Sequence, residues 1–214
     1  MGIGFVILIH FVMIFALASI IAIVLGIATY FISDKIKRKR KVFLAIFIPY
    51  QALFSFYILF FIGTVIISED KKIDVGIGDH WYVPVNKTCS INMIDLMENA
   101  YLDCDGLTIA DDIIRFQEIR NKLIGEMGNG EFFSLDLNSN KIETYKTKEE
   151  LIESEGIEKL TLTDTEDYYH SKKDYILGNS MFLVFAIALS ITLLINFVFY
   201  RLILFGRKLG FDKK

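Results

Sequence analysis

Formal charge is missing from three long stretches of this sequence, and that absence points to a class of protein. The chain has no Asp, Glu, Lys or Arg from Ile3 to Ile32, from Val42 to Ser68, or from Asn179 to Tyr200. A helix needs about 20 mainly apolar residues to cross the ~30 Å hydrocarbon core of a bilayer. Each stretch is long enough, so the sequence predicts three membrane-spanning helices.

Residues that carry catalysis or bind metals are also scarce. The chain has 3 histidines and 2 cysteines, and it contains neither the CxxC nor the HxxxH spacing of common metal sites. It also lacks a G-x-S-x-G nucleophile motif and a Gly-rich phosphate loop. We therefore expect no catalytic residue, no metal site and no cofactor. A metal pair of the cysteines with His80 or His170 is the less favoured alternative.

A basic run separates the first two apolar stretches and predicts their orientation. Six of the seven residues from Lys35 to Lys41 are basic, and further basic residues follow Tyr200. Cytoplasmic loops are enriched in Lys and Arg, so both regions should lie inside the cell and the N-terminus outside. The predicted segments are transmembrane helix 1 at 1–33, a basic cytoplasmic loop at 34–41, helix 2 at 42–68, an extracytoplasmic domain at 69–177, helix 3 at 178–203 and a cytoplasmic tail at 204–214.

The predicted extracytoplasmic domain is strongly acidic. It holds 24 of the 26 acidic residues but only 12 of the 23 basic residues. Nucleic-acid binding needs cationic side chains at the phosphates, so nucleic acid is disfavoured as a partner. Solubility, bound cations or a basic protein partner fit the charge better. Membrane lipid and a protein are the partners that the sequence predicts.

Short apolar runs bounded by turn-forming residues indicate that the domain is α+β and mostly β. Thr147 and Glu150 form a capping-box pattern that predicts a helix over Lys148–Glu155. Thr163 and Glu166 repeat the pattern before a polar helical stretch, and a further strand is compatible with 159–164. The five predicted strands are 81–85, 90–95, 100–104, 131–137 and 141–147, the last two joined in a hairpin at Asn138-Ser139-Asn140.

The passage from Phe132 to Ser154, "FFSLDLNSNKIETYKTKEELIES", resembles the closing unit of small, largely uncharacterised bacterial envelope proteins. In those proteins a strand pair with a polar turn leads into a similar helix. The resemblance implies a bacterial envelope setting and transfers no active site, and with three spans we expect the protein in the inner membrane.

Both cysteines, Cys89 and Cys104, lie in the predicted extracytoplasmic domain. Oxidising compartments preserve disulfides, and closing a loop of about 15 residues contributes ~3 kcal/mol in the chain-entropy model. We predict a disulfide between them, with free buried thiols as the alternative. Asp136, Asn138 and Asn140 imitate the start of a calcium loop, but Lys141 stands where that loop needs Gly. An ordinary hairpin turn explains these residues better.

Within the spans, small and polar residues predict how the helices pack. Ala18, Ala22 and Gly26 follow one another at intervals of four residues and place a small face on the first helix. Gln51 and Asn196 fall at similar depths, which predicts a hydrogen bond between helices worth about 1 kcal/mol. Packing of the three helices within one chain is favoured over self-association, and the oligomeric state stays open.

These features together predict a non-catalytic membrane protein that presents a protein-binding domain outside the cytoplasm, in an immunity-like or accessory-subunit role. The aromatic residues Trp81, Tyr82, Tyr168 and Tyr169 are the candidate partner-binding residues, because interfaces favour such anchors. The alternative is an oligomeric channel or membrane-disrupting effector gated by the outer domain. No span has an ionisable Asp, Glu, Lys or Arg in its middle, which disfavours ion transport.

Overall fold

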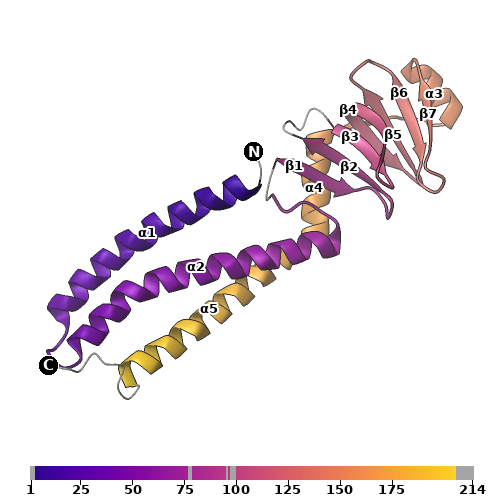
Figure 1. The fold of residues 1–214 in the computed structure, drawn as a ribbon. Coiled ribbons are helices and arrows are strands. Elements are labelled where there is room, and N and C mark those ends of the chain that lie inside the picture. The colour runs from indigo at the N-terminus through magenta and orange to yellow at the C-terminus, as the bar shows by residue number, and fades with distance from the viewer. Residues whose placement is uncertain (1–2, 77–78, 95, 97–99, 206–214) are drawn as a thin grey trace. The chain divides into compact units, whose positions relative to one another are not determined.

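The computed structural model describes residues 3–76, 79–94, 96 and 100–205, which form two compact units (Figure 1). Unit 1 is Met1–Ile66 with Asn179–Lys214, and unit 2 is Ile67–Gly178. The helices are α1 (Ile3–Ile32), α2 (Arg38–Lys71), α3 (Lys148–Glu155), α4 (Thr165–Leu177) and α5 (Ser180–Phe205). The strands are β1 (His80–Pro84), β2 (Cys89–Ile94), β3 (Ala100–Cys104), β4 (Leu107–Ile119), β5 (Lys122–Met127), β6 (Phe132–Asp136), β7 (Lys141–Tyr145) and β8 (Thr163–Asp164).

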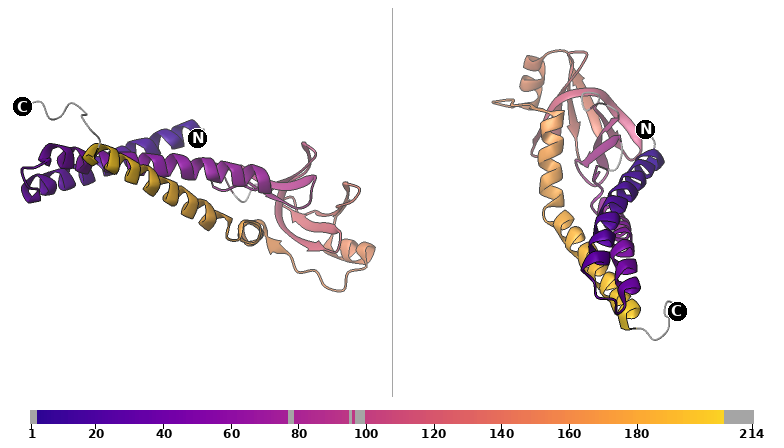
Figure 2. Two further views of the ribbon diagram at one scale, coloured as in Figure 1. Left: turned by 90° about the horizontal axis from the view of Figure 1, so that it is seen from below. Right: turned by 90° about the vertical axis from the view of Figure 1, so that its left-hand side faces the viewer.

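Unit 1 consists of the three long apolar helices, each of which is long and apolar enough to cross a membrane. The prediction of three candidate spans is therefore confirmed. Helix α2 lies between α1 and α5 (Figure 2). On one side the ring of Phe11 in α1 stacks on Phe54 of α2 at 5.7 Å, and on the other Phe47 of α2 meets Phe199 of α5 at 5.6 Å. A Cβ added at Gly63 would clash with Val184, so α2 and α5 approach closely there.

The predicted basic loop at 34–41 is shorter in the structure. Helix α2 begins at Arg38, so the second half of the basic run forms its first turn. Lys and Arg are good helix formers, and only the turn before Arg38 connects the two helices. Lys37 adopts a positive φ of 57° in that turn. Most of the predicted tail at 204–214 lies outside the described residues.

Three basic side chains of this run bind carbonyl groups at the ends of the other two helices. Lys37 Nζ donates to Leu204 O at 3.0 Å, and Arg40 Nη1 donates to Ile203 O at 3.4 Å. Arg38 Nε donates to Ser33 O, directly after α1, at 3.0 Å. The last carbonyls of a helix lack partners and carry partial negative charge, so cations stabilise them. The C-terminal ends of α1 and α5 thus lie at the same end of unit 1 as the start of α2.

Unit 2 is built on an eight-stranded antiparallel sheet, as the β-rich prediction requires. Strands β1 to β7 follow one another in chain order, each paired with the next, and β8 pairs with β4. The five predicted strands correspond to β1, β2, β3, β6 and β7. Of the predicted strand at 159–164, only Thr163 and Asp164 form one.

Sequence analysis missed β4 and β5, and the irregularity of β4 explains why. Its buried residues are Ala110, Ile113 and Phe116, spaced every third residue instead of every second. Asp112 has a φ of 55°, and the register shifts next to it on both sides, which marks a β-bulge. The bulge turns the strand, so its first half pairs with β3 and its second half with β5 and β8.

Gly125 in β5 and Gly128 in the turn after it permit the bend of β4. Gly128 N donates to Asp112 O at 2.7 Å, and a Cβ at Gly128 would collide with the Asp112 carboxylate. A Cβ at Gly125 would overlap the ring of Phe133, its partner in the register, and would lie 2.7 Å from Arg115 O. Both positions need a residue without a side chain, since backbone and ring approach them too closely for any other.

The helices α3 and α4 complete the core of unit 2. Leu151 of α3 is fully buried against Ile124, Tyr145 and Leu160. Thr147 Oγ1 accepts from Glu150 N at 3.2 Å, as the first capping box predicts, but the Glu150 carboxylate accepts from Lys146 N at 3.0 Å and not from Thr147 N.

The second capping box, at Thr163 and Glu166, is wrong. Thr163 belongs to β8, and Asp164 precedes α4 without a side-chain capping bond. Instead the Thr165 hydroxyl, 3% exposed, reaches Ile114 O at 2.8 Å. The start of α4 is therefore attached to the bulge of β4.

Candidate functional site

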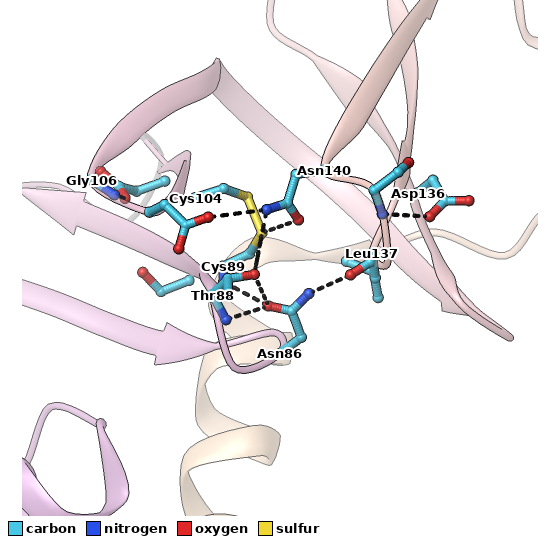
Figure 3. The surroundings of a disulfide bond; sticks show 12 residues. Asn86, Thr88, Cys89, Cys104, Gly106, Asp136, Leu137 and Asn140 are labelled. Carbon is cyan, nitrogen blue, oxygen red and sulfur yellow. Dashed lines mark hydrogen bonds between the residues drawn. A yellow bond between two sulfur atoms is a disulfide. The ribbon is translucent and has the colours of Figure 1, made fainter.

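A disulfide joins Cys89 and Cys104, which confirms the predicted pairing (Figure 3). The two residues face each other in the register of β2 and β3, and their Cα atoms are 4.0 Å apart. Both sulfur-bearing residues are buried, and neither side chain is available to a metal. The bond therefore fastens the open end of the β2–β3 pair.

Two asparagines hold the turns around this disulfide (Figure 3). Asn86 Oδ1 accepts from Cys89 N at 2.6 Å, and its Nδ2 donates to Leu137 O at 2.9 Å. Asn140 Nδ2 donates to Asp105 Oδ2 at 3.3 Å. The Asp136 carboxylate accepts from the backbone NH groups of the turn that follows it, which lowers its pKa. The Asp136 carboxylate is thus used within the hairpin turn, as an ordinary turn requires, whereas the Asn140 side chain bonds to the neighbouring turn at Asp105.

The four aromatic candidates do not form one surface. Tyr169 is 1% exposed and belongs to the core of unit 2, so the expectation that it is a surface anchor is wrong. Trp81 and Tyr82 are half-buried neighbours in β1, and successive residues of a strand point to opposite faces. Tyr168 is half-buried, with its ring 4.4 Å from that of Phe116 and its hydroxyl on Glu118.

Tyr169 instead belongs to a hydrogen-bonded group that also contains Asp74, Tyr82 and Lys173. Tyr169 OH donates to Asp74 Oδ2 at 2.7 Å, and Lys173 Nζ lies 3.3 Å from the same oxygen. Asp74 N donates to Tyr82 O at 3.1 Å. Lys71 Nζ donates to the last carbonyls of α4, including Leu177 O at 3.2 Å. Burial, followed by the bond to Asp74, raises the pKa of Tyr169, so its hydroxyl remains a donor.

Unit 2 contains a polar groove. Its volume is about 1080 Å³. We call it the hairpin groove, because the turn between β4 and β5 forms one wall and the segment after α3 forms the other. It is lined by Gln117, Glu118, Ile119, Arg120, Asn121, Lys122, Ile124, Asp136, Asn138, Ser154, Glu155, Gly156, Ile157, Glu158 and Lys159.

An ion pair between Lys122 and Glu155 lies in the hairpin groove. Lys122 Nζ is 2.5 Å from Glu155 Oε2, and the Glu155 side chain is 7% exposed. Burial alone would raise the pKa of Glu155, but the hydrogen bonds from Lys122, Ser134 and Tyr145 and the charge of Lys122 together outweigh it, so the pKa is lowered. The bond to Glu155 raises the pKa of Lys122. Both groups are therefore charged at neutral pH, and this part of the groove is electrostatically fixed.

The rim of the hairpin groove, in contrast, carries charged side chains that pair with no residue that the structure describes. Arg120, Glu158 and Lys159 are exposed, and none of them makes a side-chain hydrogen bond or ion pair with any residue that the structure describes. The Asn138 side chain is equally exposed. The rim therefore offers basic, acidic and amide side chains, which could bind the backbone amides and the charged side chains of a ligand.

The residues predicted to pack the helices lie as follows. Ala18 and Ala22 are 0% and 2% exposed, and a Cβ at Gly26 would lie 2.9 Å from Ile46 of α2. Gln51 and Asn196 each bond within their own helix, Gln51 Nε2 to Ser55 Oγ at 2.9 Å and Asn196 Nδ2 to Thr192 O at 2.8 Å. They do not bond to each other. Their side-chain oxygens and Thr192 Oγ1 are buried without a partner.

Sequence reasoning did not identify the hairpin groove, since its walls come from turns 30 or more residues apart in the chain. The residues of its rim are charged and turn-forming, a composition shared by most solvated loops. Among the described residues, no group of three His, Cys, Asp or Glu side chains lies close enough together to hold a metal ion. No protein-family model, curated protein or solved structure matches this chain.

Proposed function

We propose that this protein is a membrane-anchored binding protein whose unit 2, outside the cytoplasm, receives a polypeptide segment in the hairpin groove. It acts by recognition and not by catalysis, in the manner of an immunity protein or accessory subunit. The bacterial inner membrane is the setting that we propose for it. The basic run at one end of unit 1 supports an orientation with the N-terminus outside.

The hairpin groove is the observation that carries this proposal. Small-molecule sites are mostly apolar and of about 300–1000 Å³, whereas this groove is polar and about 1080 Å³. Its rim charges Arg120, Glu158 and Lys159 have no partner among the described residues. Unused charges of both signs around a polar concavity suit a protein segment, because interface rims are polar and complementary charges select the partner.

The charge distribution of the chain supports the same proposal. The residues from Glu69 to Leu177 hold 24 acidic and 12 basic side chains. Long-range attraction by such a surface accelerates encounter with a basic partner. We therefore propose a basic protein as the partner, because it suits both the hairpin groove and the negative electrostatic potential of unit 2.

Site-specific photocrosslinking in living cells tests the proposal directly. A photoreactive amino acid replaces Asn138 or Glu158 in the groove, and Asp111, exposed on β4 outside the groove, serves as the matched control. We expect a defined protein adduct from the two groove positions only. Adducts of the same partner from all three positions, or none from the groove, would contradict the proposal.

A charge variant of the full-length protein then measures the contribution of the rim. Glu158→Lys inverts the acidic part of the rim without touching the Lys122–Glu155 pair. Loss of the adduct at Asn138, with unit 2 still folded, is the expected result. Replacing the three spans by an unrelated set of the same topology should leave the adduct intact.

A channel is the second candidate function, and one observation favours it. The side-chain oxygens of Gln51, Thr192 and Asn196 are buried in unit 1 without partners, and polar groups at membrane depth often face water or other polar groups. In planar bilayers, a channel predicts currents that change in Gln51→Leu. The binding protein predicts no current from the purified chain.

A further inference from the structure

A second concavity lies in unit 1, between α1 and α2, and its chemistry differs from that of the hairpin groove. Its volume is about 410 Å³, and we call it the α1–α2 groove. It is lined by Ala22, Ile23, Gly26, Ile27, Tyr30, Phe31, Val42, Ile46 and Tyr50. The lining is almost wholly apolar, and it lies within a single unit of the chain.

The groove runs beside a close contact between α1 and α2. Ala22 and Gly26 fill little volume opposite Ile46 of α2, whereas Ile23 and Ile27 beside them are 61% and 56% exposed. From Ala22 to Phe31 the groove follows α1 for nine residues, or about 14 Å at 1.5 Å per residue. That length corresponds to half of a ~30 Å hydrocarbon core, the depth of one lipid leaflet.

The mouth of the α1–α2 groove is basic. Arg38 precedes Val42 and Ile46 at intervals of four residues on α2, so it continues the stripe that lines the groove. Its guanidinium lies 5.4 Å from the centre of the Tyr30 ring, and its Nε donates to Ser33 O at 3.0 Å. These contacts fix the position of Arg38, and its two terminal amino groups bond to no residue that the structure describes.

The basic run therefore divides into two functional sets. Lys37 and Arg40 are committed to the carbonyls at the end of α5. The two terminal amino groups of Arg38 lie beside the apolar groove and bond to no described residue. Lys41 lies about one turn further along α2, and its side chain has no partner among the described residues. A guanidinium recognises phosphate oxygens with two parallel hydrogen bonds.

We propose that the α1–α2 groove binds one anionic phospholipid, whose acyl chain lies along Ile23 and Ile27 and whose phosphate is held by Arg38 with Lys41. The occupant must have an apolar chain about one leaflet long and a negative headgroup at the basic end. An anionic phospholipid has both. This inference is independent of the proposed function of unit 2.

Native mass spectrometry of the full-length protein tests the site with phosphatidylglycerol and phosphatidylcholine as probes. The wild-type protein should retain one phosphatidylglycerol at least tenfold more tightly than phosphatidylcholine. Arg38→Gln should reduce the affinity for phosphatidylglycerol about tenfold and leave phosphatidylcholine unchanged. The matched control is Lys35→Gln, an exposed lysine of the same run before the mouth of the groove, which should bind as the wild type does.

A second pair of variants tests the acyl-chain part and does not depend on the basic run. Ile27→Trp fills the α1–α2 groove and should abolish retention of both lipids. Leu25→Trp makes the same kind of change at an exposed position of α1 outside the groove, and it should have no effect. Circular dichroism verifies that the variants keep their helices.

Four outcomes would overturn the proposal. One is equal retention of the two lipids by the wild type. Another is a loss in Lys35→Gln as large as that in Arg38→Gln, which would indicate a diffuse charge effect. The third is equal behaviour of Ile27→Trp and Leu25→Trp. Glycerol phosphate without acyl chains should not bind, and its retention at wild-type strength would also contradict a lipid site.

Discussion

The two units place their large apolar side chains in opposite ways. In unit 2, Phe116 and Phe133 are fully buried, whereas in unit 1 Phe31 and Phe182 are 77% and 74% exposed. Unit 2 thus has the core of a water-soluble domain, and its stability rests on removing apolar surface from water. Among the described residues of unit 1 the buried cluster of Leu44, Ile203 and Leu204 is small, and the exposed apolar surface fits helices that are long and apolar enough to cross a membrane. A core substitution should therefore affect the two units very differently.

Polar groups show a second contrast between the units. In unit 2, buried polar groups such as Asp74 and Thr165 are bonded to partners. In unit 1, cations bind the free carbonyls at the helix ends, but three side-chain oxygens inside remain unpartnered. The buried polar groups of unit 2 are held in specific hydrogen bonds. Unit 1 depends on packing of its helices, which leaves a few polar oxygens without hydrogen-bond partners. The predictions that follow test this difference.

Removing a core ring of unit 2 should have the largest effect. Phe116→Ala should lower the free energy of unfolding of unit 2 by about 3–5 kcal/mol, because the ring is fully buried and leaves a cavity. The single tryptophan, Trp81, lies in β1 and reports on unit 2 alone during urea unfolding in detergent. Phe182→Ala, an exposed ring of α5, is the control and should leave this transition unchanged. A similar shift in both variants would refute the contrast.

Loss of the disulfide should have the next largest effect. Replacing Cys89 and Cys104 together by Ala should destabilise unit 2 by about 3 kcal/mol, since the bond closes a loop of 15 residues. The same Trp81 transition measures it. Reduction of the wild-type protein should reproduce the shift and slow its migration on a gel. Two free thiols in protein extracted under thiol-trapping conditions would contradict the bond.

The Lys122–Glu155 pair should contribute less, and its contribution should depend on pH. Glu155 has a pKa below its ordinary 4.5 and Lys122 a pKa above its ordinary 10.5. The lowered pKa of Glu155 stabilises unit 2 above pH 4.5, and this is lost as the pH falls through the folded-state value. The raised pKa of Lys122 stabilises below pH 10.5, and this is lost as the pH rises further.

Unfolding of Glu155→Gln and of the wild type at several pH values measures this pair. At pH 7 the variant should be less stable by about 1 kcal/mol, because the Lys122 side chain is 40% exposed and water screens the pair. The difference should shrink as the pH falls from 4.5 towards 3. A difference that is constant from pH 7 to pH 3 would show that the charge of Glu155 does not matter.

The smallest effect is expected in unit 1 and has the opposite sign. Asn196→Leu removes a buried oxygen that lacks a partner, so the helices should become more resistant to SDS, or stay equal, within about 1 kcal/mol. Ser190→Leu is the matched control, because its hydroxyl also bonds within α5 but is exposed. Far-UV circular dichroism during SDS titration measures both. A clear loss of resistance in Asn196→Leu alone would show that its oxygen has a partner in the membrane.

Local patterns made most of the architecture predictable. Uncharged stretches predicted the three long helices, and short apolar runs bounded by turn-forming residues predicted five strands. The bulge at Asp112 hid β4, because it changes the spacing of buried residues from two to three. The predicted hydrogen bond between Gln51 and Asn196 is absent, because each amide group bonds within its own helix. Equal depth in the membrane does not determine which way an amide points.

Tyr169 illustrates why the candidate site could not be predicted from the sequence. A tyrosine in a polar, charged helix has the composition of a surface anchor, yet it is buried by Asp74, a residue 95 positions earlier in the chain. The hairpin groove has the same origin in distant segments. Such sites arise from the topology of the sheet and carry no local signal.

The bond between Asp74 and Tyr169 also sets an order for biosynthesis. Strands β1 to β7 pair with their neighbours in the chain and can form as each emerges, because short loops close quickly. Asp74 is made at the start of unit 2, but its buried partners on α4 are made only at the end. A nascent chain that has not yet reached α4 keeps this carboxylate in water and one edge of its fold unfinished. Completion of unit 2 therefore waits until the residues just before α5 have been synthesised.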